Sequence, residues 1–177
     1  ELTKQLLTFS SRQTIQPRKI NFNSVVHRSH ELLKSALGEG ITIEYGLKKS
    51  KSLLINADPT QMQQILLNLA IHAHEKMSGT GTVEISTSIT SLTREDRRRG
   101  SIVAELEDKK IRKYVCLTFH EKGFHSTEEE LERIFDPFVK TDTGEVIMDF
   151  GMATVYGIVH QNRGCIEVVS SEESGTT

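Results

Sequence analysis

One segment of this chain, residues 58–77, has the pattern of a long amphipathic helix with a clearly marked beginning. Asp58 is a good N-cap residue, Pro59 suits the first helical position, and Gln61 stands where it can complete a capping box. The apolar positions follow helical spacing and form one face: Met62, Ile65, Leu66, Leu69, Ala70 and Ala73. The opposite face is polar: Gln61, Gln64, Asn68, His72 and Glu75. Ser78-Gly79 is predicted to end this helix.

The other segments alternate between helical and extended patterns. We predict further helices at 2–12, from Asn23 or Ser24 to Gly38, at 128–134 with Ser126 or Thr127 as the cap, and at 152–161. Strands are predicted at 41–45, 53–55, 82–90, 114–119 and 165–170. Helices that alternate with a mixed sheet are typical of the α/β or α+β class.

Composition narrows the function classes. The 177 residues suit one domain with a short appendage, and 36% hydrophobic residues are enough for one core. The net charge of −2 argues against a general nucleic-acid binder, and the basic run at 94–99 is interpreted as a solvated loop. No apolar run reaches the roughly 18–20 residues that span a bilayer. Cys116 and Cys165, both in strand-like segments, are predicted to be buried free thiols in a reducing compartment.

Three stretches carry a resemblance to a known family. The stretch ADPTQMQQILLNLAIHAHEKM is similar to the asparagine-box helix of sensor histidine kinases. The stretch YVCLTFHEKGFHSTEEELERIFDPFV resembles their strand, first glycine box and phenylalanine box. The stretch FGMATVYGIVHQNRGCIEVVSSEESGTT resembles the second glycine box, the helix that follows and the terminal strand. Near the start, LLTFSSRQTIQPRKINFNSVV looks like the junction between the dimerisation helix and the catalytic domain.

The resemblance implies an α+β fold, a two-layer α/β sandwich of the histidine kinase ATPase (Bergerat) type with helices on one face of a mixed sheet. It divides the chain into the end of the dimerisation helix with its linker at 1–16 and the ATPase domain at 17–177. It also implies a homodimeric parent with this part in the cytoplasm, and it is compatible with a membrane anchor elsewhere in the parent. The expected partners are a response regulator or a partner histidine kinase, with no nucleic acid and no direct membrane contact in this fragment. The phospho-accepting histidine is expected upstream of residue 1, because His30-Glu31-Leu32 lacks the proline of that motif and follows the linker.

Family alignment also supplies the nucleotide-binding positions: Asn68, His72, Glu121, Gly123, His125, Lys140, Asp149, Gly151 and Thr176. Several depart from the family pattern. His72 replaces the asparagine that holds Mg²⁺, and an imidazole nitrogen is a poor ligand for that ion. Glu121 replaces an aspartate that accepts from the adenine amino group, and His125 replaces a glycine.

The phosphate-binding loop departs further. Ile147 and Asp149 replace two glycines that precede Gly151, and Asp149 brings a negative charge to the place of the phosphates. Asp142 stands at a lid position that is often lysine, with Lys140 two residues earlier.

Three hypotheses follow from these departures. The first is a degenerate domain with weak or no Mg-ATP binding, which acts through protein contacts. In this hypothesis the apolar lid residues fold down with Phe124 into the space that nucleotide would fill. These lid residues are Val146, Ile147, Met148 and Phe150. The second is an active ATP-dependent histidine kinase with atypical residues, which would use ATP and Mg²⁺. The third is a metal site made from His72, His74, His120, Glu121 and His125, set against the simpler interpretation of satisfied or solvated histidines. A nucleoside or an ADP-like ligand remains compatible with the first hypothesis.

Overall fold

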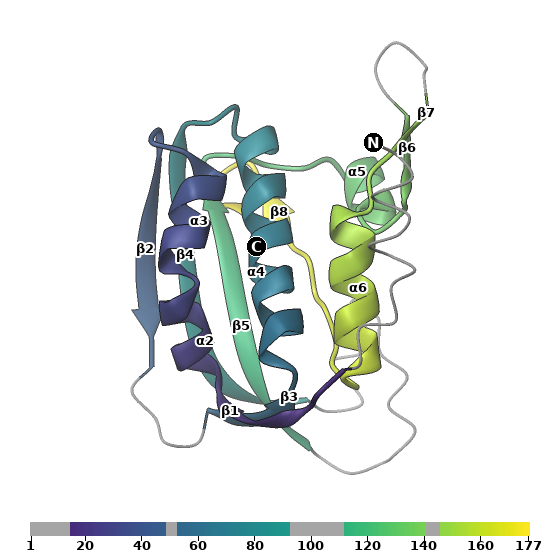
Figure 1. The fold of residues 1–177 in the computed structure, drawn as a ribbon. Helices are drawn as coiled ribbons and strands as arrows, with labels where there is room; N and C mark the ends of the chain where they lie inside the picture. The colour runs from purple at the N-terminus through teal and green to yellow at the C-terminus, as the bar shows by residue number, and fades with distance from the viewer. Residues whose placement is uncertain (1–14, 49–52, 93–111, 141–145) are drawn as a thin grey trace.

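A mixed five-stranded sheet with helices on one face forms the body of the molecule (Figure 1). The computed structural model describes residues 15–48, 53–92, 112–140 and 146–177. The strands run in the order β2-β4-β5-β9-β8, namely Ile41–Leu47, Gly81–Leu92, Arg112–Lys122, Gly175–Thr176 and Ser170–Ser171. β2 pairs with β4 in parallel, and the other pairs are antiparallel. The predicted α+β sandwich is therefore confirmed.

The helices cover the sheet from one side, as Figure 1 shows. They are α2 (Phe22–Arg28), α3 (His30–Leu37), α4 (Pro59–Lys76), α5 (Glu128–Arg133) and α6 (Gly151–Gln161). Two small antiparallel sheets are separate from the main one: β1 (Arg18–Asn21) pairs with β3 (Leu54–Ala57), and β6 (Phe138–Lys140) pairs with β7 (Val146–Met148). None of the described helices is long and apolar enough to span a bilayer.

The beginning of α4 follows the sequence prediction in part. Asp58 Oδ1 accepts the backbone N–H of Thr60 at 2.8 Å, and Pro59 occupies the first turn. Asp58 Oδ2 also accepts the N–H of Gln16, which is the largest cause of a lowered pKa for that carboxyl group. Gln61 does not complete a capping box: its Nε2 donates to Gln161 Oε1 at 2.8 Å, so the side chain joins α4 to α6.

The predicted single helix after Asn23 is wrong, because two short helices meet at Ser29. The buried Ser29 hydroxyl donates to the carbonyl of Val25 at 2.9 Å, a contact that bends helices. Asn23 does not cap α2, since its amide donates to the carbonyl of Lys48 and accepts from Thr87. Gly38 ends α3 with φ 78°, as predicted.

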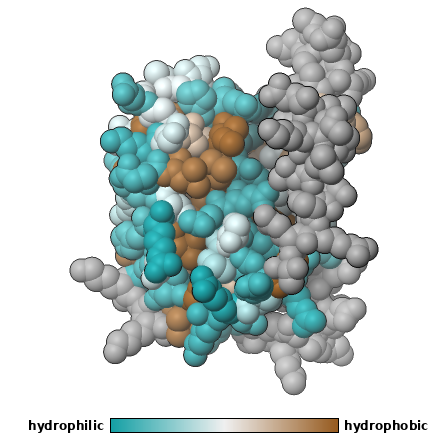
Figure 2. All heavy atoms as spheres, in the orientation of Figure 1, coloured by the Kyte–Doolittle hydropathy of each residue, from teal (hydrophilic) through white to brown (hydrophobic). Residues whose placement is uncertain are grey.

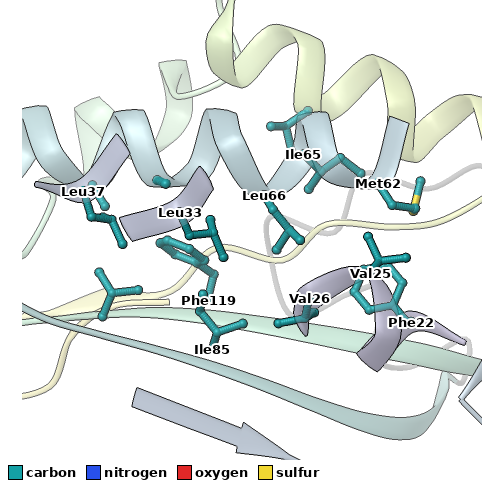
Figure 3. Packing of buried hydrophobic residues seen from close by; sticks show 14 of the residues in the cluster. Phe22, Val25, Val26, Leu33, Leu37, Met62, Ile65, Leu66, Ile85 and Phe119 are labelled. Atoms are coloured by element: carbon teal, nitrogen blue, oxygen red, sulfur yellow. The ribbon is translucent and has the colours of Figure 1, made fainter. Parts of the chain in front are cut away.

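The core lies between the helices and the sheet (Figure 3). Val26, Leu33 and Leu66 from the helix layer are fully buried, and they meet Ile85 of β4 and Phe119 of β5. Figure 2 shows apolar surface over α3 and α4 on the outer side of that layer. The exposed large apolar residues of these two helices are Leu32 and Ile71, at 40% and 42%.

Some strand and helix predictions need correction. β1 was not predicted. Of the strand predicted at 165–170, only Ser170 lies in an assigned strand, β8 (Ser170–Ser171), although Val169 also exchanges backbone hydrogen bonds with Thr177. Both cysteines are free but only half-buried, and Cys165 lies outside any strand. Burial raises the pKa of the Cys165 thiol. The predicted helix at 2–12 and the basic run at 94–99 lie outside the described residues.

Candidate functional site

The polar stripe of α4 meets the end of β5 at His72 and Glu121. His72 Nδ1 and Glu121 Oε1 lie 3.4 Å apart, and the two side chains are 12% and 5% exposed. The second carboxylate oxygen, Glu121 Oε2, is buried without a hydrogen-bond partner among the described residues. A buried carboxylate oxygen without a donor is costly, so this atom marks a place for an N–H or O–H group.

Strand pairing and two glycines hold Glu121 in place. Glu121 is paired with Thr176 of β9. Gly175 has φ 92°, and a Cβ built there would lie 2.1 Å from the carbonyl oxygen of Glu121, so only glycine permits this approach. Gly123 has φ 87° and turns the chain directly after β5. Thr176 is buried, and its hydroxyl donates to the carbonyl of Phe124 at 3.1 Å.

At the other end of the site, Asn68 and Asp149 both bond to Gly151, the first residue of α6. Asn68 Nδ2 donates to the carbonyl of Gly151 at 3.1 Å. Asp149 Oδ1 accepts the N–H of Gly151 at 2.8 Å. A helix N-terminus presents free N–H groups that attract anions. In this chain the protein's own carboxylate takes one of them.

The prediction that the lid residues fold into the nucleotide space is wrong for Met148. The β6–β7 ladder pairs Phe138 with Met148 and holds this segment in a hairpin, where the two side chains are 61% and 41% exposed. Phe150 is half-buried. Phe124 is partly buried against the core, and the Lys76 ammonium lies 6.0 Å from its ring centre. The structure does not describe the side chains of Lys140, Val146 and Ile147, nor residue Asp142.

The metal-site hypothesis is wrong for the residues that the structure describes, since no three His, Cys, Asp or Glu side chains gather there. Of the four histidines in this hypothesis, only His72 has a ring nitrogen close to the Glu121 carboxylate. His120 Nδ1 bonds to Thr177 Oγ1 at 2.8 Å on the other face of β5, because neighbouring strand residues point to opposite sides. His74 Nδ1 donates to the carbonyl of Leu37, and His125 lies 4.0 Å from Glu172.

His30, which superficially resembles a phospho-accepting histidine, begins α3 and bonds through Nδ1 to the Tyr45 hydroxyl at 2.9 Å. It therefore belongs to the helix layer of the sandwich. Burial raises the pKa of the Tyr45 hydroxyl.

A cavity of about 830 Å³ extends from the His72–Glu121 pair along the edge of β5. Its walls include Leu69 and Met152 from the helices, Leu117 from β5, and the segment 162–169. Tyr114 also lines this cavity, and its buried hydroxyl has no hydrogen-bond partner among the described residues. The sequence did not indicate this cavity, because it depends on how strands from distant parts of the chain pair.

Comparison with known proteins identifies the class. Residues 57–177 match the family model described as histidine kinase-, DNA gyrase B-, and HSP90-like ATPase. The chain belongs to this ATPase family, and the relatives it resembles are sensor histidine kinases. The sensor kinase CckA of Brucella abortus is 30% identical over 99% of this chain and 18% of its own length. The sensor histidine kinase ZraS of Salmonella typhimurium is 23% identical over 98% of this chain and 33% of its own.

The fold comparison agrees. The histidine kinase ThkA, solved in complex with the response regulator protein TrrA, superimposes with a TM-score of 0.66 at 20% identity. That match covers 99% of this chain and 44% of the ThkA chain. The chain thus has the fold of a histidine kinase ATPase domain, and it spans a third or less of the length of the curated relatives named above.

Proposed function

We propose that this domain is a degenerate ATPase domain of a sensor histidine kinase, which does not bind Mg-triphosphate productively and acts in phosphorelay signalling through protein contacts. The observation that carries the proposal is the bond from the Gly151 N–H to Asp149 Oδ1. It places a fixed negative charge at the N-terminus of α6, where the family places phosphates. A phosphate oxygen would have to approach that charge, and the two would repel.

The metal end of the site does not fit Mg²⁺ either. This ion needs oxygen ligands in tight octahedral geometry and keeps several of its waters. The position that supplies an amide oxygen in the family is His72, and its Nδ1 is already directed at Glu121. We therefore derive no catalytic step through a bound metal or triphosphate.

The end of the site at Glu121, where the family holds the adenine base, fits a ligand better. Glu121 Oε2 is buried and lacks a donor among the described residues, and an exocyclic amino group of a purine would supply one. Gly123, at φ 87° with nothing within 4 Å of a built Cβ, leaves room beside it. A nucleoside, or a nucleotide without Mg²⁺, is the ligand class that this half of the site supports.

The unpaired oxygen of the Glu121 carboxylate also favours a second candidate, an active ATP-dependent histidine kinase with atypical residues. An active site would keep such a carboxylate at the adenine position. In that case the Asp149–Gly151 bond would break when nucleotide enters. ATP and Mg²⁺ would then be the cofactors.

For partners, the proposal names a response regulator or a partner histidine kinase. The structure of ThkA with TrrA supports the first, since a protein of the same fold is solved with a response regulator protein. A homodimeric parent with this domain in the cytoplasm, and a boundary between linker and domain near residue 16, stay predictions. The nucleotide positions carried over from the family, from Asn68 to Thr176, stay proposals in the same way.

The test is isothermal titration calorimetry with adenosine and with ATP, each with and without Mg²⁺. The expected result is that adenosine binds and that Mg²⁺ does not strengthen ATP binding. The matched variant His72→Asn restores an amide oxygen at the metal position. It should make ATP binding respond to Mg²⁺. Micromolar Mg-ATP binding by the unaltered protein would overturn the proposal and favour the active kinase.

A further inference from the structure

The strand β2 forms one edge of the main sheet. It runs without interruption over 7 residues, Ile41–Leu47, and it pairs with β4 on one side. Among the residues that the structure describes, no segment pairs with its other side. In Figure 1, β2 lies at the outer margin of the sheet, and no labelled helix or strand stands beyond it. Such an edge is a template for another strand, because its N–H and C=O groups remain free.

The hydrogen-bond directions along β2 follow from its parallel pairing with β4. The carbonyl of Gly40 accepts the N–H of Gly81 at 3.2 Å, so the backbone groups of Gly40 point toward β4. Because these directions alternate along a strand, Thr42, Glu44 and Gly46 bond toward β4 as well. The N–H and C=O groups of the residues between them point to the free edge: Ile41, Ile43, Tyr45 and Leu47.

The edge of β2 lacks the usual protection against another strand. Natural sheets guard an edge with charge, proline or a bulge, but β2 has no proline and its register with β4 is continuous. Its one charged residue is Glu44, whose Oε2 lies 2.6 Å from the Lys122 ammonium. Lys122 belongs to β5, two strands away from the edge, and it also pairs with Glu84 of β4. The Glu44 carboxylate is therefore drawn inward across the sheet, away from the edge it could guard.

The residues of β2 match one another when two copies of the strand run antiparallel about Glu44. In this register Ile41 lies opposite Leu47 of the second copy, and Ile43 lies opposite Tyr45. Each of these residues directs its backbone groups outward, so every such pair can exchange two hydrogen bonds. Glu44 lies opposite itself on the two-fold axis. No shifted register pairs all the residues of both strands.

The side chains support the same register on both faces of the sheet. On the helix side Ile43 meets Tyr45, and pairs of aromatic with β-branched residues stabilise antiparallel strands. Tyr45 is 38% exposed, and its hydroxyl bonds to His30 Nδ1 at 2.9 Å, so the ring is held beside the edge before a second strand arrives. On the other face Thr42 lies opposite Gly46, which leaves room for its side chain.

We propose that β2 is a contact surface for a second copy of this chain, and that two copies pair antiparallel along it about Glu44. The same surface is used by both copies, which is the arrangement that a two-fold axis requires. The two five-stranded sheets would join into one continuous sheet. No residue of the nucleotide site takes part, so the proposal does not rest on the proposed function.

Cysteine cross-linking of the full chain tests the register. On the axis the two Glu44 residues form a non-hydrogen-bonded pair with Cα atoms about 4.5 Å apart, within the range of a disulfide. Mild oxidation of Glu44→Cys should therefore give a linked dimer. Thr42→Cys is the matched control, since its two copies would lie about 13 Å apart along the strands. The unaltered protein, with its free Cys116 and Cys165, gives the background. No linked dimer from Glu44→Cys, or equal amounts from both variants, would overturn the register.

Analytical ultracentrifugation measures the association without a cross-link. Tyr45→Pro removes an outward N–H from each copy but leaves the bonds to β4, and edge strands tolerate proline at such positions. Tyr45→Val keeps the N–H and an apolar β-branched side chain. The Kd of the dimer should rise about tenfold or more in Tyr45→Pro and stay within about threefold in Tyr45→Val. A dimer that is equally stable in both variants would place the contact elsewhere, and an unaltered protein that stays monomeric at millimolar concentration would refute it.

Amide hydrogen exchange separates pairing between copies from an edge that the chain covers itself. Exchange at Ile43 and Tyr45 should slow as the protein concentration rises, whereas exchange at Thr42 and Glu44, which bond toward β4, should not change. Full protection of Ile43 and Tyr45 in dilute, monomeric samples would mean that the chain covers its own edge, and the proposal fails. This measurement also decides the question if Tyr45→Pro does not fold. None of these outcomes depends on nucleotide binding, so the proposed function is tested separately.

Discussion

At the scale of single residues, the site depends on two carboxylates that have opposite surroundings. Glu121 is 4% exposed and keeps one oxygen without a partner among the described residues. Asp149 is half-buried and uses an oxygen to bond Gly151. One oxygen of Glu121 is thus open to a hydrogen-bond donor from a ligand, whereas Asp149 already accepts the Gly151 N–H. This difference explains why the two ends of the site should respond differently to ligands.

Substitutions at Asp149 separate its charge from its hydrogen bond. Asp149→Asn keeps an acceptor for the Gly151 N–H, so unfolding free energy should change by less than about 0.5 kcal/mol, whereas Asp149→Ala should lose about 1 kcal/mol. Both remove the charge and should bind ADP about tenfold more tightly than the unaltered protein, about 1.4 kcal/mol. Urea denaturation and calorimetry measure the two effects. Unchanged ADP affinity in both variants would show that the charge does not obstruct phosphate.

The residue pattern predicted part of this site. Asn68 and His72 are one helical turn apart, so local geometry alone brings them to one face. The negative charge of Asp149 was also apparent from the sequence. Its bond to Gly151 was not predicted, because the pattern does not show which way a side chain just before α6 turns. The resemblance assigned His72 and Glu121 to one site, but their 3.4 Å approach depends on how α4 packs on β5.

At the scale of elements, local signals predicted where α4 and α5 begin. Thr127 and Glu130 form a reciprocal capping box at α5, and Asp58 caps α4. The break at Ser29 was missed because nothing in the local pattern shows that its hydroxyl would bond Val25. β1 was missed because the sequence RKIN lacks an apolar alternation and becomes a strand by pairing with β3.

Met148 is a further residue whose environment local sequence signals did not predict. Its apolar character suggested burial, but a hairpin with Phe138 holds it at the surface. Pairing between two segments decided the outcome, and hydrophobicity alone could not predict it.

The contact between α5 and α4 should make stability depend on pH. The Thr127 N–H, and then Lys76 at 3.0 Å, lower the pKa of Glu130 below its usual 4.5. A carboxyl group with a depressed folded-state pKa stabilises the fold above its unfolded pKa, and this contribution is lost as pH falls through the folded value. Glu130→Gln should therefore destabilise the protein at pH 7, with the difference shrinking as pH falls below 4.5.

Urea denaturation of both proteins across that range gives the measurement. The exposed Glu132, for which the described part of the chain shows no ion pair, supplies the control Glu132→Gln. A difference between Glu130→Gln and the unaltered protein that stays constant with pH would contradict the assignment.

At the scale of the whole molecule, one core between the helix layer and the sheet carries the stability. Leu66 is fully buried where α4 meets α2 and β4 in Figure 3, whereas Ile71 of the same helix is 42% exposed. Leu66→Ala should cost about 3 kcal/mol of unfolding free energy, since it removes apolar contacts and leaves a cavity. Ile71→Ala should cost less than about 0.5 kcal/mol. Equal losses in denaturant titrations would mean that the core is not where the packing places it.

The close approach of β9 to β5 at Gly175 has a consequence for which sequences can keep this site. Because a Cβ at Gly175 would lie 2.1 Å from the carbonyl oxygen of Glu121, any other residue there would push β9 away from the end of β5. The backbone that positions the Glu121 carboxylate would then shift with it. The shape of this end of the site therefore depends on a residue that contributes no side chain to it.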